Sequence, residues 1–353
     1  MPPLQGILPA LVTPFDESGR FQEAAFERLL ERVYQADIDG VYVCGSTGEG
    51  LLQPVEQRKR VAEAAIRLSP PGKLVIVHTG AHRTSDAVEL TRHAAEAGAA
   101  AASSLPPAGA YAFDEVYAYY RALSTAADLP FLVYFFPAFS SAIAGLAQIL
   151  ELCRLPGVIG LKYTDHDLYR MSLVRNTGAV VFSGYDEVLV AGLLMGACGG
   201  IGTFYNLIPE LFVEVKSLAG EGRWTEARAV QARINELIEI TVRYPCFPAV
   251  KTILRWSGLD CGRCLAPRRS FTADEERGLR EALRGSSFAS GDRHSANAAC
   301  ALYAKLSDQG IFVEVLRTLA WHAEPRPAFA LFHRMLIQRS LLSRSLTRLR
   351  EGH

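Results

Sequence analysis

Short β-branched runs alternate with longer amphipathic stretches through the first two thirds of the chain, and this alternation constrains the fold most. Each run is followed by a segment with the apolar periodicity of a helix. The runs contain few polar residues, as expected of parallel strands covered on both faces. Eight such strand–helix units favour a closed (β/α)8 barrel of the α/β class over an open sheet. The predicted strands are 6–15, Gly40–Cys44, Leu74–His78, Ala99–Ser104, Phe131–Tyr134, Val158–Lys162, Ala179–Ser183 and Gly199–Gly202.

After Gly222 the pattern becomes helical only, with helices predicted at 223–243, 246–257 and 273–284. We therefore divide the chain into three parts. These are a TIM barrel in 1–222, a C-terminal helical extension in 223–286, and a linker with an extra helical tail in 287–353.

The tail holds nine Lys or Arg residues against five Asp or Glu residues. A basic amphipathic end could bind an acidic partner or a membrane surface, but an extra helical appendage that packs on the barrel or is largely loose is the favoured interpretation.

Neither the net charge nor the apolar runs of the chain indicate a nucleic-acid-binding or membrane protein. The formal net charge is zero, which gives no indication of nucleic acid or an anionic membrane as partner. No apolar run reaches the roughly 18 residues of a membrane-spanning helix, and Met1-Pro2-Pro3 does not open a signal peptide.

Seven scattered cysteines indicate a reducing compartment, so we expect a cytoplasmic protein in which Cys44, Cys153 and Cys198 serve as small hydrophobes. Cys261 and Cys264 form a single CxxC without a second pair of ligands. We interpret this motif as a loop and predict no metal site.

Two residues at the ends of predicted strands could carry covalent chemistry. Lys162 closes the run GVIGLK, and a lysine buried in a barrel mouth favours the neutral amine that attacks carbonyls. Tyr134 ends an earlier strand, and its phenol could relay a proton. Taken singly, a lysine reaching to water and a core tyrosine are the plain alternatives.

Polar turns follow other strands. In Gly45–Glu49, backbone N–H groups and the Ser46 and Thr47 hydroxyls could wrap a carboxylate, while Glu49 could orient the turn through backbone hydrogen bonds. An ordinary Gly/Ser loop is the alternative.

Asp186 and Glu187 follow the seventh strand and suit the hydroxyls of a polyol, although acidic residues also favour a helix N-terminus. The glycines before Thr203 match no dinucleotide fingerprint, so no nucleotide site is predicted.

Together these residues resemble the Schiff-base aldolase family that includes dihydrodipicolinate synthase and N-acetylneuraminate lyase. Residues 4–285 carry the resemblance, and the lyase branch is the more similar, through GLKYTDHDLYRM, SGYDEVLVAGLLMGACGGIGTFYN and the VKTIL segment. The resemblance implies a small-molecule 2-keto acid substrate, no cofactor and a homotetramer. It makes Lys162 the Schiff-base lysine and Tyr134 the proton carrier. It assigns substrate contacts to Ser46, Thr47, Thr164, Gly184, Asp186, Glu187 and Thr203.

The sequence also departs from the family pattern. Phe135 replaces an asparagine, and Thr203 stands where a serine is common. The loop 106–110 reads PPAGA where the family usually has tyrosines, so either Tyr111 or a water substitutes, or the proton relay is weakened. The stretch 135–139 lacks the arginine typical of the synthase branch, which tells against a second substrate carboxylate.

We therefore predict a class I lyase that cleaves N-acetylneuraminate, or a similar 2-keto sugar acid, to pyruvate and N-acetylmannosamine. The alternatives are synthase-like chemistry, an aldolase for 2-keto-3-deoxy sugar acids, and a non-catalytic carboxylate-binding barrel.

Overall fold

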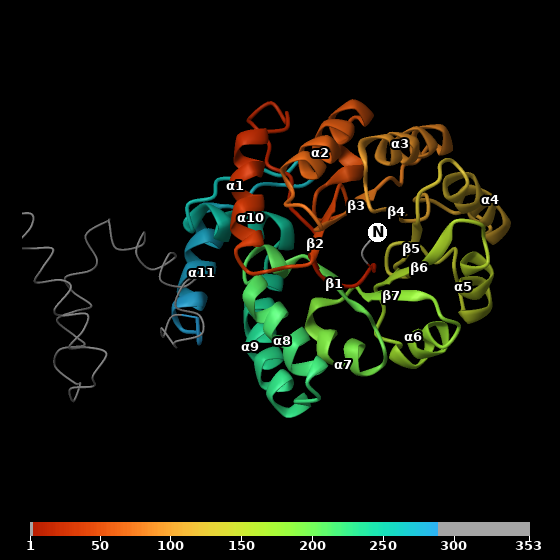
Figure 1. Cartoon of the computed structure of the whole chain (residues 1–353). Coiled ribbons are helices and arrows are strands. Elements are labelled where there is room, and N and C mark those ends of the chain that lie inside the picture. Colours follow the sequence, from red (N-terminus) through yellow and green to blue (C-terminus); the bar gives the residue numbers. More distant parts are fainter. Residues whose placement is uncertain (1–2, 289–353) are drawn as a thin grey trace, which may run out of the picture. The chain divides into compact units, whose positions relative to one another are not determined.

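Eight short parallel strands form the centre of the computed structural model, which describes residues 3–288 (Figure 1). Neighbouring strands follow the order β1-β8-β7-β6-β5-β4-β3-β2. Between β1 and β2, a parallel bridge joins Ala10 to Tyr42, and the Leu11 N–H donates to the Tyr42 carbonyl at 2.9 Å. The predicted (β/α)8 barrel is confirmed. The strands are β1 (Gly6–Pro9), β2 (Gly40–Val43), β3 (Leu74–His78), β4 (Ala101–Ser104), β5 (Phe131–Phe135), β6 (Val158–Tyr163), β7 (Val180–Ser183) and β8 (Gly199–Gly202).

A helix follows every strand, and Figure 1 shows these helices arranged around the strands. They are α1 (Glu23–Tyr34), α2 (Val55–Leu68), α3 (Thr84–Ala97), α4 (Phe113–Ser124), α5 (Leu146–Cys153), α6 (Leu168–Arg175), α7 (Leu189–Leu194) and α8 (Pro209–Gly220). Single 3-10 turns η1 (Gly50–Leu52), η2 (Asp186–Val188) and η3 (Phe204–Asn206) precede α2, α7 and α8.

The first strand is shorter than the predicted run 6–15. It ends at Pro9, because the backbone beyond Ala10 leaves the strand ladder. The Val12 N–H donates instead to Asn206 Oδ1 at 3.2 Å, and Asn206 Nδ2 donates to the Ala10 carbonyl at 2.7 Å. Asn206 thus satisfies buried backbone groups that a longer strand would have paired.

The predicted C-terminal helices are present as α9 (Trp224–Val242), α10 (Cys246–Trp256) and α11 (Ala273–Arg284). Helix α9 packs along α8 and contacts η2, while α10 and α11 both contact α9. Thr272 caps α11 reciprocally: its hydroxyl accepts from the Glu275 N–H, and the Glu275 carboxylate accepts from the Thr272 N–H. The CxxC residues lie in the irregular segment between α10 and α11, in agreement with a loop.

Two apolar clusters build the core. The larger lies between the strands and the surrounding helices and continues among α8–α11. The smaller fills the barrel with side chains from alternate strand positions. Its members are Leu8, Ala10, Tyr42, Leu74, Ile76, Ala101, Leu105, Leu132, Tyr134, Phe182 and Ile201.

The predicted tail from residue 289 onward lies outside the described residues. Within 3–288, no helix combines the length and the apolarity required to cross a bilayer. In the same range, no group of three or more His, Cys, Asp or Glu side chains is placed to hold a metal ion.

Candidate active site

The strand register places Lys162 inside the barrel. In parallel pairing, Lys162 lies beside Tyr134 of β5 and Phe182 of β7. Both neighbours belong to the interior cluster, and paired residues in adjacent strands point to the same face. Lys162 is 4% exposed and lies one residue before the end of β6. Its side chain therefore occupies the carboxyl end of the barrel, where active sites of this fold lie.

The Lys162 amine is surrounded by aromatic rings. Its Nζ lies 4.3 Å from the centre of the Tyr134 ring and 4.7 Å from that of Tyr42. The two rings meet edge to face at 6.4 Å. Among the described residues, no hydrogen bond or ion pair holds this amine. A buried amine without a fixed partner is free to meet a bound carbonyl.

Tyr42 and His78 line the same interior but were not predicted as site residues. His78 lies 6.2 Å from the Tyr134 ring, and the Tyr42 hydroxyl donates to Ser103 Oγ at 3.3 Å. Burial, then the charges of Arg58 and Lys162, lower the pKa of His78 well below 6.5. The neutral ring accepts at Nε2 from the Leu105 N–H at 3.0 Å. A polar aromatic residue within each otherwise apolar strand was the available signal.

The turn after β2 is held from two sides. The Thr13 hydroxyl and the Gln53 amide both donate to the Gly48 carbonyl, at 2.8 and 2.7 Å. The Thr47 hydroxyl lies 2.7 Å from that of Thr203, which follows β8. Thus two predicted hydroxyl residues meet at the carboxyl end of the barrel, from the strands on either side of β1. Ser46 is half-buried, and its hydroxyl makes no hydrogen bond within residues 3–288.

Glu49 makes contacts both within and beyond its own turn: its N–H donates to the Ser46 carbonyl at 3.2 Å, while its carboxylate reaches the C-terminal part of the chain. It is fully buried and pairs with Lys251 of α10, with Oε1 2.9 Å from Nζ. Its Oε2 accepts from the Leu265 N–H at 2.7 Å. Glu49 itself has a left-handed φ of 56°, which is uncommon outside glycine. The turn is therefore closed locally by backbone hydrogen bonds and also tied to the C-terminal segment through the Glu49 carboxylate.

Thr164 and Gly184 lie against each other at the ends of β6 and β7. A Cβ on Gly184 would lie 1.9 Å from Thr164 Oγ1, so only glycine fits here. Thr164 is 4% exposed, and its hydroxyl has no hydrogen-bond partner among the described residues. A buried hydroxyl without a partner is costly, which makes it a candidate for a ligand contact.

Asp186 is buried beneath the end of β8. Its Oδ2 accepts from the Phe204 N–H at 2.6 Å, and a Cβ on Gly202 would lie 1.9 Å from Oδ1. Burial raises the pKa of Asp186 from 3.8 to about 7, opposed by the Phe204 N–H and the Lys162 charge.

Glu187 is half-buried beside Asp186. Helix α9 holds this pair through the backbone, because Gln231 donates to the Asp186 carbonyl and Asn235 to the Glu187 carbonyl, each at 3.0 Å. Neither amide was singled out in the sequence. Their role follows only from the packing of α9 against η2.

The structure brings the predicted residues into linked groups at one end of the barrel. Lys162 contacts Tyr134, Thr164 contacts Gly184, and Thr47 contacts Thr203, whose neighbour Phe204 binds Asp186. Tyr111 lies in the altered loop after β4 with 38% of its surface exposed.

The fold and this arrangement define a (β/α)8-barrel protein with a buried lysine among polar groups at the carboxyl ends of its strands. The chain belongs to the dihydrodipicolinate synthetase family, whose model matches residues 3–285. The family resemblance stated above is confirmed.

The chain is also similar to individual proteins of known name. The chain is 38% identical to an N-acetylneuraminate lyase of Rhizobium meliloti over 286 residues, covering 79% of this chain and 94% of that protein. A structure of CdNal from Clostridium difficile in complex with mannosamine matches with a TM-score of 0.77 and 26% identity, covering 80% and 99% of the two chains. A catalytic lysine mutant of the sialic acid aldolase from Ruminococcus gnavus matches with a TM-score of 0.76 and 28% identity, covering 80% and 97%.

Proposed function

We propose that the protein is a carbon–carbon lyase that cleaves N-acetylneuraminate to pyruvate and N-acetylmannosamine through a lysine imine. The relatives named as N-acetylneuraminate lyase and sialic acid aldolase support this activity, since each is matched over nearly its whole length. The structure of the relative from Ruminococcus gnavus that carries a catalytic lysine mutation supports a lysine as the reactive group.

The environment of Lys162 is the observation that carries the proposal. Its amine is buried at the barrel mouth, lies over the rings of Tyr42 and Tyr134, and has no polar partner among the described residues. A structural lysine at this depth would be expected to pair with a carboxylate, as Lys251 does with Glu49. Lys162 is therefore the better candidate nucleophile.

In the proposed reaction the neutral Lys162 amine attacks the substrate ketone, and the adduct loses water to give an iminium. A base removes the proton of the fourth-carbon hydroxyl, and the bond between the third and fourth carbons breaks. Its electrons flow into the iminium, which becomes the enamine of pyruvate as the aldehyde leaves. Protonation and hydrolysis then release pyruvate and restore the amine.

Tyr134 is the proposed proton carrier, together with the substrate carboxylate. Its ring contacts the Lys162 amine, and its hydroxyl makes no hydrogen bond within the described part of the chain. Positioned acid–base groups of this kind contribute about 10²–10⁴-fold in rate. The iminium itself supplies the electrophile, so the mechanism needs no cofactor.

The remaining groups are proposed to orient the substrate. Ser46 and Thr47 would hold the carboxylate at the turn after β2. The sugar-derived hydroxyls would meet Thr164, Gly184, Asp186, Glu187 and Thr203. The Thr164 hydroxyl, which is buried and has no hydrogen-bond partner within residues 3–288, supports this assignment most directly.

The segment after β5 favours the lyase over the synthase reaction. Phe136 stacks on Tyr134 with the rings 6.0 Å apart, and the following residues include no arginine. Apolar side chains here cannot pair with a second substrate carboxylate.

A borohydride trap tests the covalent step. Wild-type protein incubated with pyruvate and borohydride should gain the reduced pyruvyl group on the peptide that contains Lys162. Lys162→Arg should gain none, while Lys73→Arg, a control at the amino end of β3 that pairs with Asp37, should label as the wild type does. An unlabelled Lys162 peptide in the folded wild type would favour the non-catalytic alternative.

A substrate panel tests the branch assignment. Pyruvate release from N-acetylneuraminate should exceed that from 2-keto-3-deoxy sugar acids. Pyruvate release from the shorter acids alone would be consistent with the proposed mechanism but would contradict N-acetylneuraminate as the substrate. On the family resemblance we further propose a homotetramer, and on cysteine usage a cytoplasmic protein.

A further inference from the structure

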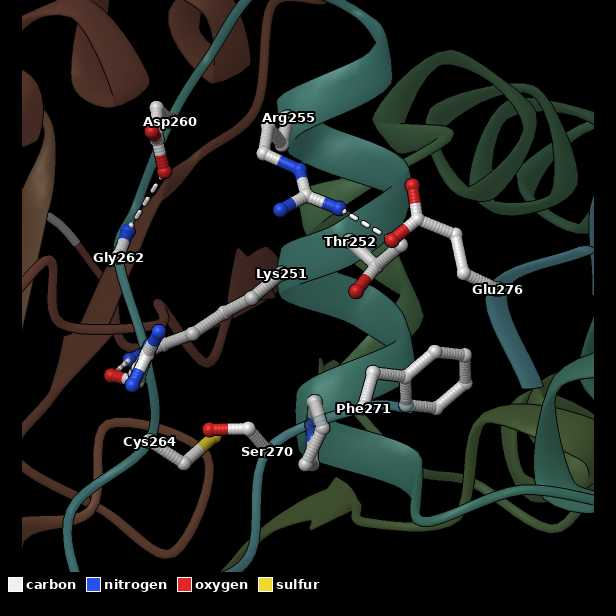
Figure 2. A pocket seen from close by; sticks show the side chains of 11 residues that line it. Lys251, Thr252, Arg255, Asp260, Gly262, Cys264, Ser270, Phe271 and Glu276 are labelled. Carbon is white, nitrogen blue, oxygen red and sulfur yellow. Dashed lines mark hydrogen bonds and ion pairs between the residues drawn. The ribbon is translucent and has the colours of Figure 1, made fainter. Parts of the chain in front are cut away.

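A cavity lies away from the barrel mouth, between α10 and the segment that leads to α11 (Figure 2). Its volume is about 150 Å³. Figure 2 shows Lys251 crossing this space from α10 toward the 260–264 segment, with Arg255 further along the helix. The lining residues are Pro248, Lys251, Thr252, Arg255, Asp260, Gly262, Arg263, Cys264, Ser270, Phe271 and Glu276.

Three cationic side chains line the cavity, and two of them are already paired. Arg255 lies 2.6 Å from the Glu276 carboxylate, and Lys251 lies 2.9 Å from Glu49. Arg263 makes no side-chain hydrogen bond or ion pair within residues 3–288, although its carbonyl accepts from Lys251 Nζ at 3.0 Å. The guanidinium of Arg263 is therefore available to an anion from solvent.

The other polar groups indicate which anion fits. Asp260 accepts from the Gly262 N–H at 2.9 Å through one carboxylate oxygen, and its other oxygen has no partner among the described residues. Ser270 adds a hydroxyl. A sulfate offers acceptors only and would be repelled by Asp260. A hydrogen phosphate carries an O–H that can donate to Asp260, while its other oxygens accept from Arg263 and Ser270.

The cavity is connected to the turn after β2 by a short chain of contacts. Lys251 bonds to the Arg263 carbonyl on one side and to Glu49 on the other. Leu265, two residues beyond Arg263, donates its N–H to the same Glu49 carboxylate. Glu49 stands two residues after Thr47. A ligand that fixes Arg263 therefore stabilises the 263–265 segment, which holds Glu49 in its left-handed conformation.

We propose that this cavity is a binding site for hydrogen phosphate or the phosphate group of a monoester. Occupancy of the site strengthens binding of the keto acid at the barrel mouth. The effect on keto acid binding rests on the proposed function, because it assigns the substrate carboxylate to the turn at Ser46 and Thr47. The phosphate site itself does not depend on the proposed function.

Calorimetric titration of the full chain at constant ionic strength tests the site. Inorganic phosphate and ethyl phosphate are the ligands, sulfate is the comparison anion, and the tighter of the two phosphates identifies the source. Arg263→Ala should weaken phosphate binding about ten-fold, since a charge-assisted hydrogen bond is lost. Arg228→Ala, which removes an exposed arginine of α9 outside the cavity, should bind as the wild type does. Binding unchanged in Arg263→Ala, or equal for sulfate and phosphate, would overturn the site.

Substrate kinetics test the connection. Phosphate should lower the wild-type KM about five-fold, a typical coupling between two sites, and leave kcat unchanged. Phosphate that competes at the turn itself would raise KM in both the wild type and Arg263→Ala. The difference between their KM responses therefore measures the effect of phosphate bound in the cavity. Equal KM responses in both proteins would overturn the connection. Absence of turnover would count against the proposed function and would leave the calorimetric result standing.

Discussion

Asp186→Asn should change how the stability of the protein depends on pH. Burial raises the pKa of this carboxyl from 3.8 to about 7, so the folded protein favours its neutral form. Below about pH 4 the group is protonated in both the folded and the unfolded chain. As pH rises from there to about 7, the unfolded chain loses its proton first, and the folded state loses relative stability. Above about pH 7 both states are ionised and the loss is complete.

The size of the effect follows from this pKa difference. At about 1.4 kcal/mol for each pKa unit, the wild type loses about 4 kcal/mol of unfolding free energy across this window. Asparagine does not titrate, and its side-chain oxygen can still accept from the Phe204 N–H. The difference in unfolding free energy between the variant and the wild type should therefore change by about 4 kcal/mol in favour of the variant from about pH 4 to about pH 7. This change does not depend on how stable the variant is at low pH.

Urea unfolding at a series of pH values from about 4 to 8 measures this difference. Titration of all other groups is common to both proteins and cancels in the comparison. Asp128→Asn, an exposed aspartate after α4, serves as control and should show a constant difference from the wild type. A constant difference for Asp186→Asn as well, or one that grows toward acid, would refute the reasoning.

Three further outcomes are expected. Tyr134→Phe keeps the ring over the amine but should lower kcat for pyruvate release about 10²–10⁴-fold while borohydride trapping persists; an unchanged kcat contradicts the role of the phenol. Thr47→Val removes the hydrogen bond to Thr203 and should raise KM about five-fold in steady-state assays, at about 1 kcal/mol for one such bond. A change in kcat alone would argue against a binding role. Lys251→Met strands the buried Glu49 carboxylate and should cost about 3–5 kcal/mol in chemical denaturation. Adding Glu49→Gln should recover part of that loss, and an equal loss in the double variant would show that the pair is not coupled.

Several features of the site were predictable because they depend on local pattern. Lys162 and Tyr134 end apolar runs of strand length, and the carboxyl ends of parallel strands share one end of a barrel. The Gly45–Gly48 turn was visible from its residue types alone. The structure places these residues at that end and brings Lys162 against Tyr134.

Other features could not be predicted from pattern. Tyr42 and His78 stand out as the polar aromatic residues of their strands, but strands buried on both faces show no alternation that separates the inner from the outer positions. The Glu49–Lys251 pair joins the second strand–helix unit to the C-terminal helices. Sequence spacing carries no information about such a contact, so the pairing of Glu49 with Lys251 was not predicted.

The sequence by itself determined the class of fold, because strand and helix periodicities and turn chemistry are local properties of the chain. It also determined which residue types stand at the strand ends. Only the tertiary structure decided three properties of the part that it describes. Lys162 has aromatic neighbours in place of a carboxylate, burial raises the pKa of Asp186, and the Arg263 guanidinium lines a cavity without a partner among residues 3–288. These properties depend on burial and on contacts between distant segments, which exist only once the barrel has closed.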